Sequence, residues 1–284
     1  MKVVLFCGGY GMRMRDYSDA MPKPMAPIGY RPILWHLMKY YAHYGHKEFI
    51  LCLGYRGDAI KNYFLNYDEC VSNDFVLSGG GKNVEMISKD IEDWKITFVD
   101  TGLNANIGMR LNRVRQYVEQ DEAFMANYAD GLTDLPLSVL EDYFWKHGKV
   151  ATFLGVKPMN SYHIVSTAND GVVTGVESTD ASSQRINGGF FIFRPSIFDY
   201  MKDGEELVEE PFGRLIRDRQ LSAYSHDGFW ACMDIFKEKQ KLDDLHSKGC
   251  APWEVWNKPQ TELNVHATRT LRSTSEIAVP RGSL

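Results

Sequence analysis

Near its start the chain reads Lys2-Val3-Val4-Leu5-Phe6-Cys7-Gly8-Gly9-Tyr10-Gly11-Met12-Arg13-Met14, and Pro22-Lys23-Pro24-Met25 follows soon afterwards. The apolar run at residues 2–7 predicts a β-strand. The three glycines behind it predict a turn in which main-chain N–H groups approach a ligand closely, with φ angles that other residues avoid. Successive N–H groups in such a turn form a concavity that binds anions. Because Arg13 and Lys23 add two positive charges nearby, the segment is typical of a triphosphate site.

Two common phosphate-binding motifs do not match this segment. The dinucleotide fingerprint G-x-G-x-x-G requires a glycine where the chain has Met14. The P-loop requires Gly-Lys followed by Ser or Thr, where the chain has Met12-Arg13-Met14. A Gly-rich turn after a strand is more often a plain turn, so the prediction of phosphate binding depends equally on the Pro-Lys-Pro element.

The composition is that of an ordinary globular protein with one large domain or two small ones. The chain has 284 residues, of which 44% are hydrophobic and 24% charged. Its net charge of −5 provides no overall basic field for nucleic acid or an anionic membrane. The five cysteines are scattered without a Cys-x-x-Cys motif, which favours reduced thiols over a disulfide framework or a zinc site. The apolar stretch Val3 to Phe6 is too short for a signal peptide, so we expect a cytoplasmic protein.

Over the first 156 residues, short β-like runs alternate with helical patterns. The predicted strands are 2–7, 48–53, 95–100, 123–128 and 150–156, and the predicted helices are 32–43, 58–65, 110–118 and 137–145. Such alternation predicts a doubly wound, mostly parallel (Rossmann-like) mixed sheet with helices on both faces. Since ligands of such sheets bind outside the carboxyl ends of the strands, we expect the Gly-rich turn, Asp100 and Asp130 at one edge.

The second half of the chain has a different pattern and predicts a smaller β-rich acceptor lobe. Asn169-Asp170-Gly171 indicates a hairpin turn, residues 186–193 a strand and 234–247 an amphipathic helix. We expect a single domain at 1–256, with a nucleotide-binding part at 1–156 and an acceptor and metal part at 157–256. Residues 64–95 interrupt the alternation and predict a small insertion lobe or an oligomer contact. Residues 257–284 lack periodicity and are expected to form a mobile tail, either native or left by protease-site engineering.

Two aspartates are the candidate metal ligands. Asp130 follows a predicted strand and precedes Gly131, and Asp234 opens the last predicted helix. Taken singly, they are interpreted as a turn aspartate and a helix N-cap, and either role is compatible with metal binding. Mg²⁺ prefers one or two carboxylates together with waters and substrate phosphates. The pair therefore predicts a magnesium site against a nucleotide phosphate.

The Gly8 segment and the Pro-Lys-Pro-Met element together resemble the signature of the sugar-1-phosphate nucleotidylyltransferases, G-G-x-G-T-R-L followed by P-K-P-M. Met12 and Met14 replace the Thr and the Leu of that pattern. The resemblance covers residues 1–256. Phe229-Trp230, Met233-Asp234 and Ala251-Pro252-Trp253 make the chain most similar to the glucose-1-phosphate cytidylyltransferase subgroup.

This resemblance implies a Mg²⁺-dependent cytidylyltransferase that moves CMP from CTP to a phosphate-bearing acceptor and releases pyrophosphate. It also implies a homo-oligomer and a role in capsule or cell-surface polysaccharide synthesis. The implied catalytic residues are Arg13 and Lys23, and the implied metal ligands are Asp130 and Asp234. The implied nucleotide-binding residues are Phe6, Cys7, Gly8, Gly9, Tyr10, Gly11, Met12, Arg13, Lys23, Arg110 and Tyr128. The implied acceptor-binding residues are Tyr162, His163, Glu177, Arg185, Asn187 and Gly188.

The acceptor half departs from the family pattern. The family has Arg-Phe-Gly-Ala where the chain has Ser161-Tyr162-His163-Ile164, and Glu-Lys-Pro where it has Glu177-Ser178-Thr179. The family lysine that grips the sugar phosphate is therefore missing, and a strong phosphate contact is lost with it. Arg185 is either its replacement or an exposed charge at a strand end. The acceptor is thus glucose 1-phosphate, another sugar 1-phosphate, or a non-sugar phosphate or phosphoramidate such as phosphoglutamine.

Other functions stay open at this point. The base of the nucleotide is not determined, so UTP and dTTP are alternatives to CTP. A non-catalytic nucleotide-binding homologue is a second class of function, favoured by the missing lysine and disfavoured by Arg13, Lys23 and the two aspartates. A nicotinamide-dependent oxidoreductase is disfavoured because the third glycine of its fingerprint is absent.

Overall fold

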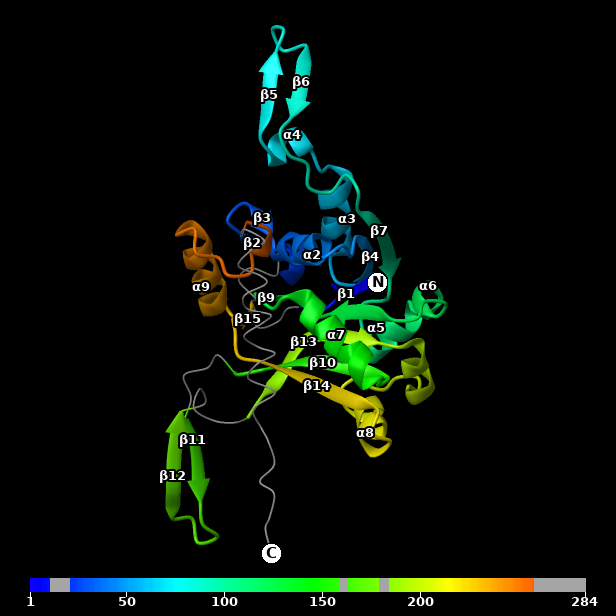
Figure 1. Ribbon diagram of the computed structural model, residues 1–284, viewed down its shortest axis with the longest axis vertical. Helices are drawn as coiled ribbons and strands as arrows, with labels where there is room; N and C mark the ends of the chain where they lie inside the picture. Colours follow the sequence, from blue (N-terminus) through cyan, green and yellow to red (C-terminus); the bar gives the residue numbers. More distant parts are fainter. Residues whose placement is uncertain (11–20, 159–162, 179–183, 258–284) are drawn as a thin grey trace, which may run out of the picture.

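A computed structural model describes residues 1–10, 21–158, 163–178 and 184–257. Its centre is a seven-stranded sheet with the order β14-β10-β13-β8-β1-β4-β7 (Figure 1). The strands are β1 (Val3–Phe6), β4 (Glu48–Leu53), β7 (Lys95–Asp100), β8 (Phe124–Asn127), β10 (Ala151–Val156), β13 (Ile186–Phe193) and β14 (Leu221–His226). Only β13 runs antiparallel to its neighbours, β8 and β10, and the other pairs in this sheet are parallel. The mostly parallel mixed sheet is confirmed, and each predicted strand agrees within one residue at either end.

Helices cover both faces of the sheet, because alternate residues of each strand point to opposite sides. Val3 and Leu5 of β1 belong to one buried cluster, with α2 (Ile33–His43), α7 (Leu137–His147) and α9 (Phe236–Ser247). Val4 and Phe6 belong to the other, with α5 (Ile107–Arg113), α6 (Arg115–Val118) and α8 (Glu210–Arg217). The single helix predicted at 110–118 is wrong. The backbone of Val114, at φ −101° and ψ 5°, separates two short helices there.

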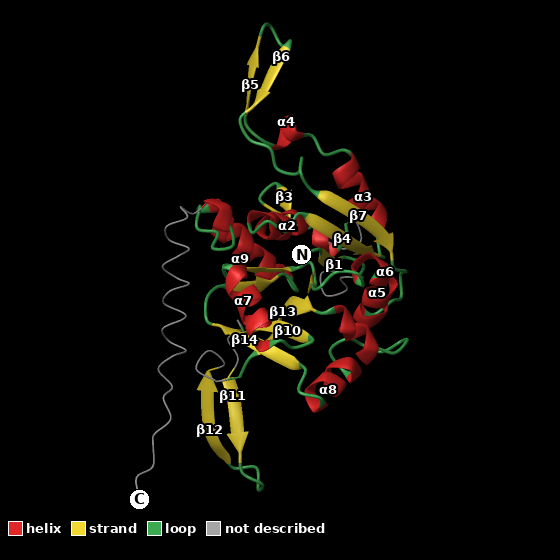
Figure 2. Cartoon of the chain, turned by 45° about the vertical axis from the view of Figure 1, so that its right-hand side comes forward, coloured by secondary structure: helices red, strands yellow, loops and turns green. Residues whose placement is uncertain are grey.

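Four small antiparallel pairs complete the fold. They are β2 (Pro27–Ile28) with β3 (Arg31–Pro32), β5 (Phe75–Ser78) with β6 (Asn83–Met86), β9 (Gly131–Thr133) with β15 (Trp230–Cys232), and β11 (His163–Thr167) with β12 (Val173–Ser178). The hairpin predicted at Asn169 to Gly171 is confirmed as β11–β12. The β5–β6 and β11–β12 hairpins project from opposite ends of the molecule in both ribbon views (Figures 1 and 2).

The remaining short elements are α3 (Gly57–Leu65), α4 (Glu69–Ser72) and the 3-10 turns η2 (Lys23–Met25), η3 (Pro195–Tyr200) and η4 (Val255–Asn257). All five cysteines, which lie within the described residues, are free thiols, as predicted. Among the helices that the structure describes, none is long and apolar enough to cross a membrane. The expected tail beyond Asn257 lies outside the described residues.

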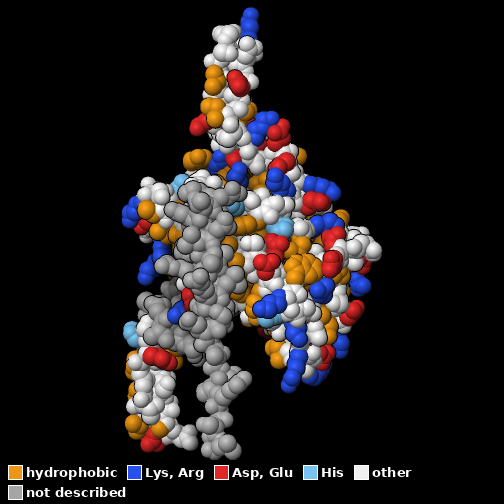
Figure 3. Space-filling model, viewed as in Figure 1, with side chains coloured by type: hydrophobic (Ala, Val, Ile, Leu, Met, Phe, Trp, Pro, Cys, Tyr) orange, Lys and Arg blue, Asp and Glu red, His pale blue; other side chains and the backbone are white. Residues whose placement is uncertain are grey.

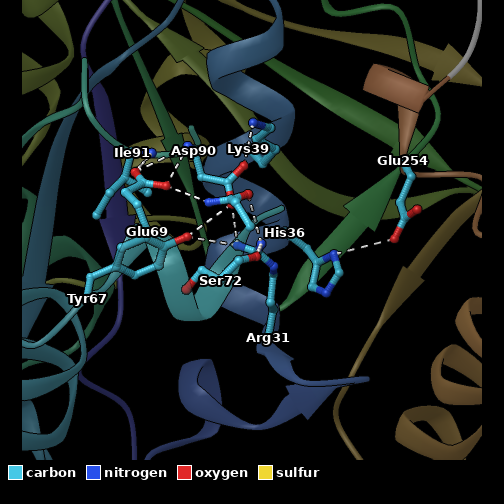
Figure 4. A network of polar contacts seen from close by, with 10 residues as sticks. Arg31, His36, Lys39, Tyr67, Glu69, Ser72, Asp90, Ile91 and Glu254 are labelled. Carbon is cyan, nitrogen blue, oxygen red and sulfur yellow. Dashed lines mark hydrogen bonds and ion pairs between the residues drawn. The ribbon is translucent and has the colours of Figure 1, made fainter. Parts of the chain in front are cut away.

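A network of charged groups joins the segment that carries β5–β6 to the body (Figure 4). The Asp90 carboxylate lies 2.6 Å from Arg31 Nη1 and 3.0 Å from Lys39 Nζ, and it accepts a hydrogen bond from the Tyr67 hydroxyl. Glu69 accepts hydrogen bonds from the N–H groups of residues 90 and 91. Burial raises the pKa of Asp90, but Lys39 and Arg31 outweigh it and hold the pKa below its usual value. The base of the projecting segment is therefore fixed by partly buried ion pairs.

We expect Asp90→Ala to lower the free energy of unfolding by about 2 kcal/mol, because it leaves two half-buried cations without their shared anion. Asp93→Ala is the matched control, since its ion pair with Lys47 is exposed on both sides. That substitution should cost no more than about 1 kcal/mol. Urea unfolding at constant m-value measures both. Equal losses in the two variants would contradict a structural role for the Asp90 network.

Candidate active site

A cavity of about 1450 Å³ lies at the carboxyl ends of β1 and β8. Phe6 and Gly9 line it at the end of β1, and Asn127 and Tyr128 line it at the end of β8. The sequence-predicted site residues that line it are Phe6, Gly9, Lys23, Arg110, Tyr128, Asp130, Asn187, Gly188 and Asp234. Gly11, Met12, Arg13 and Tyr162 lie outside the described residues. Asp100, expected at the same edge, does not line the cavity and instead accepts a hydrogen bond from Gly102 N.

Arg110 binds the main chain of the Gly-rich turn. Its guanidinium is buried and donates hydrogen bonds to Gly8 O at 2.9 Å, Leu53 O at 3.1 Å and Thr101 Oγ1 at 2.8 Å. A Cβ atom on Gly8 would lie 2.0 Å from Arg110 Nη1, whereas one on Gly9 would meet nothing within 4 Å. Neither glycine has a positive φ, so the expectation of unusual φ angles is wrong for these two. Gly8 is required by close packing against the guanidinium.

The other residues of the turn face in different directions. Cys7 is completely buried and continues the strand, with its N–H bonded to Cys52 O at 3.0 Å. Burial raises the pKa of the Cys7 thiol, so it stays protonated. Tyr10 is exposed, and its hydroxyl donates to Asn104 Oδ1 at 2.8 Å.

Lys23 lies between the two predicted metal ligands. Its Nζ is 2.5 Å from Asp130 Oδ2 and 2.5 Å from Asp234 Oδ1. The two carboxylate oxygens are therefore within about 5 Å of each other, since both contact one nitrogen. Burial lowers the pKa of Lys23, but the two carboxylates outweigh it and raise the pKa above its usual value. The ammonium group lies at the point where the two carboxylates converge. A divalent ion at this point would have the two carboxylates as ligands and would take waters and phosphates as its remaining ligands.

The β9–β15 pairing brings these aspartates together from distant parts of the chain. Cys232 pairs with Gly131 in an antiparallel ladder. The chain that follows Cys232 therefore lies beside the chain that precedes Gly131, where Asp130 is located. Asp234 is not the N-cap of α9, as one interpretation of the sequence had it, because the helix begins two residues later. Instead, the N–H groups of Asp234 and Ile235 donate to Glu238 Oε2 at 2.6 and 3.1 Å.

The predicted acceptor residues are divided by the fold. Asn187 and Gly188 line the cavity at the start of β13, where Asn187 Nδ2 donates to Tyr128 Oη at 3.1 Å and Trp230 Nε1 donates to Gly188 O at 2.8 Å. Arg185 does not line the cavity, and its guanidinium binds Asp227 Oδ1 at 2.8 Å and a main-chain carbonyl.

His163 and Glu177 lie elsewhere, exposed on the β11–β12 hairpin. The structure therefore brings two of the five described acceptor candidates into the cavity.

Sequence reasoning missed one face of α9. Lys237, Gln240, Lys241 and Asp244 line the cavity. Their spacing of three and four residues marks one face of a helix, and the predicted helix began at a predicted metal ligand. These two signals together would have indicated that the face borders the site.

We expect Gly8→Ala to lower the free energy of unfolding by about 3 kcal/mol, because the new methyl group displaces a buried, hydrogen-bonded guanidinium. Gly9→Ala is the control on the adjacent residue and should change stability by less than about 1 kcal/mol. Thermal and urea unfolding without substrates measure both effects. If Gly8→Ala is as stable as Gly9→Ala, the contact with Arg110 does not explain the glycine.

Some known proteins resemble this chain in sequence, and some solved structures resemble it in fold. No protein-family model matches it. A probable glucose-1-phosphate cytidylyltransferase of Bacillus subtilis is 40% identical over 258 residues, covering 90% of this chain and all of that protein. The glucose-1-phosphate cytidylyltransferase of Salmonella typhimurium is 39% identical over 257 residues, again 90% of this chain and all of the relative.

Solved structures show the same fold at low sequence identity. A UDP-glucose pyrophosphorylase complexed with UDP-glucose has a TM-score of 0.65 and 16% identity, over 87% of this chain and 98% of that one. HddC from Yersinia pseudotuberculosis has a TM-score of 0.59 and 19% identity, over 86% of this chain and 99% of that one.

Proposed function

The chain belongs to the sugar-1-phosphate nucleotidylyltransferase family, and from that premise we propose that it transfers CMP from CTP to a phosphate-bearing acceptor, releasing pyrophosphate. The names of its relatives support glucose 1-phosphate as the acceptor. The observation that carries the proposal is the convergence of Asp130 and Asp234 on Lys23 in a cavity that the Gly-rich turn borders. That arrangement provides a cation-binding centre where a nucleotide phosphate would lie.

In the proposed reaction the acceptor phosphate attacks the α-phosphorus of CTP in line with the departing pyrophosphate. The second pKa of a phosphate monoester is about 6, so the nucleophile is already ionised at neutral pH and needs no general base. Catalysis then depends on positioning and on neutralisation of charge. Mg²⁺ held by Asp130 and Asp234 would supply Lewis-acid polarisation of the phosphate.

Lys23 provides fixed positive charge in this mechanism. Its ammonium group lies beside both aspartates and would stabilise charge that develops on the α-phosphate. We assign the same role to Arg13, on the family pattern. Arg110 is a positioning residue, because its hydrogen bonds go to main-chain and threonine oxygens that shape the turn.

For the two halves of the site we propose different residues. Phe6, Gly9 and Tyr128 border the nucleotide, and Asn187 and Gly188 border the acceptor. The binding of Arg185 to Asp227 does not support its role as a phosphate ligand in this arrangement. The free cysteines support a reducing compartment, and we propose that the enzyme acts in the cytoplasm.

A matrix of CTP, UTP and dTTP against phosphate monoesters, scored by pyrophosphate release, tests this function. We expect turnover with CTP, Mg²⁺ and glucose 1-phosphate, with phosphoglutamine and other sugar 1-phosphates as further arms. Asp130→Asn and Asp234→Asn should each reduce kcat by at least about 100-fold, since each removes charge from the cation site.

Asp227→Asn is the control for the loss of one carboxylate, because Asp227 does not line the cavity. It should keep turnover within about three-fold. Full turnover in Asp130→Asn or Asp234→Asn would refute the metal assignment. Absence of pyrophosphate release from every combination would favour a non-catalytic homologue.

We also propose that the chain forms a homo-oligomer through the β5–β6 hairpin. Phe75, Val76, Leu77 and Val84 of this hairpin are exposed by 38% to 58%. Hydrophobic side chains follow one edge of this projecting segment (Figure 3). An isolated two-stranded hairpin is only marginally stable in water, and a further strand or surface usually covers it. A second copy of the chain is the partner that we propose.

Leu77→Glu should shift the full chain to a smaller oligomer or to the monomer, because burying a charge in an apolar contact is unfavourable. Ile216→Glu is the control, since Ile216 is similarly exposed on α8, outside the hairpin. Light scattering after gel filtration gives the molar mass of both. A monomeric unchanged chain, or equal masses for all three proteins, would contradict the proposal.

A further inference from the structure

One face of α9 brings two lysines to the cavity. Lys237 and Lys241 are exposed side chains that line it, one helical turn apart. The rise of an α-helix places them about 6 Å apart along the axis, so their ammonium groups can reach one anion together. Gln240 and Asp244 lie on the same lining face.

The charges of the cavity lining explain why these two lysines matter. Among the described residues, the lining contains more acidic than basic side chains: Asp130, Glu206, Asp234, Glu238 and Asp244 against Lys23, Arg110, Lys237 and Lys241. Substrates that carry several phosphates must nevertheless bind there. Lys23 is engaged by two aspartates, and Arg110 by the carbonyl groups behind the Gly-rich turn.

Lys237 and Lys241 differ from Lys23 and Arg110 in having no such partners among the residues that the structure describes. Within the described part of the chain, neither takes part in an ion pair or a side-chain hydrogen bond. Lys239, on the opposite face of the same helix, is buried and lies 2.6 Å from Asp243. Of these three lysines, Lys239 therefore packs within the protein, and Lys237 and Lys241 line the cavity.

The position of α9 indicates which substrate group these lysines meet. The helix begins two residues after Asp234, whose carboxylate contacts Lys23. It packs on β2, and Asp243 accepts a hydrogen bond from the N–H of Gly29, the residue after β2. Strand β2 begins two residues after the turn that carries Lys23. Helix α9 is therefore tied to the segment that carries Lys23 by Asp234 before its first turn and by Asp243 near its end, whereas Asn187 and Gly188 belong to β13.

We propose that Lys237 and Lys241 bind the β- and γ-phosphates of the nucleoside triphosphate and, after transfer, the pyrophosphate product. The inference rests on the proposed function and specifies how the same site holds the leaving group. During transfer an acceptor oxygen forms a bond to the α-phosphorus, and the bond to the bridging oxygen breaks with its electron pair going to pyrophosphate. Two ammonium groups beside that oxygen stabilise the charge it gains. Lysine is a usual phosphate ligand because its ammonium acts as a compact point charge.

Calorimetric binding of Mg²⁺–pyrophosphate to the full chain tests the proposal without turnover. We expect Lys237→Met and Lys241→Met each to raise the Kd about three- to ten-fold, and the double variant to raise it further. The slope of log Kd against log salt should become shallower, as for the loss of any exposed charge contact. In steady-state kinetics the KM for CTP should rise while the KM for the acceptor stays constant. Lys241→Arg should restore most of the affinity.

Lys248→Met is the matched control, because Lys248 is an exposed lysine at the end of α9 that does not line the cavity. It should leave pyrophosphate affinity unchanged. Unchanged affinity in the double variant would overturn the proposal. So would a rise confined to the acceptor KM, which would place the lysines in the acceptor half. Failure of the proposed function is distinguishable from failure of this proposal. It would appear as no pyrophosphate release in the substrate matrix, with the binding differences between the lysine variants intact.

Discussion

The hydrogen bonds of the buried Arg110 guanidinium are the constraint on which the site depends. They join Gly8 after β1, Leu53 at the end of β4 and Thr101 after β7, which are the ends of three neighbouring strands. Burial of a charged group is unfavourable unless oxygens satisfy its donors, and here carbonyl and hydroxyl oxygens do so. Gly54 is subject to the same constraint, since a Cβ there would lie 2.6 Å from Gly8 O. The shape of the Gly-rich turn is thus determined by its packing against the buried Arg110 side chain.

The proposed cation centre depends on a contact between distant parts of the chain. Asp130 and Asp234 converge because β15 pairs with β9, and Lys23 reaches both from a short turn that is fixed against α2. The same β15 leads into α9, so the helix face with Lys237 and Lys241 is positioned by the pairing that forms the centre. Asp234 and the two lysines proposed to bind pyrophosphate therefore lie on one continuous stretch of chain after β15.

Local patterns in the sequence predicted six of the seven strands of the central sheet and the helices α2, α3, α7 and α9, but not β14, α4 or α8. They succeeded where the alternation of apolar residues reports directly on the burial of an element. They also indicated Asp130, which follows a predicted strand, and Asp234, which opens a predicted helix. Contacts between remote segments were not predictable in this way. The β9–β15 pairing involves three residues on each side, too few for a periodic signal. The packing of Gly8 on Arg110 and the binding of Arg185 to Asp227 likewise arise only once the chain is folded. The family resemblance supplied Arg110 as a site residue but not its role behind the turn.

The reversed direction of β13 has a consequence for how the chain can vary beside the proposed acceptor half. Because β13 is antiparallel to β10, its first residue, Ile186, pairs with Val156, the last residue of β10. The chain between these two strands, which includes the β11–β12 hairpin, therefore leaves and re-enters the sheet at a single point beside Asn187 and Gly188. Insertions, deletions or exchange of that whole segment shift no strand of the central sheet. The chain beside the proposed acceptor half can in this way change in length while the strands that carry the proposed nucleotide half stay in place.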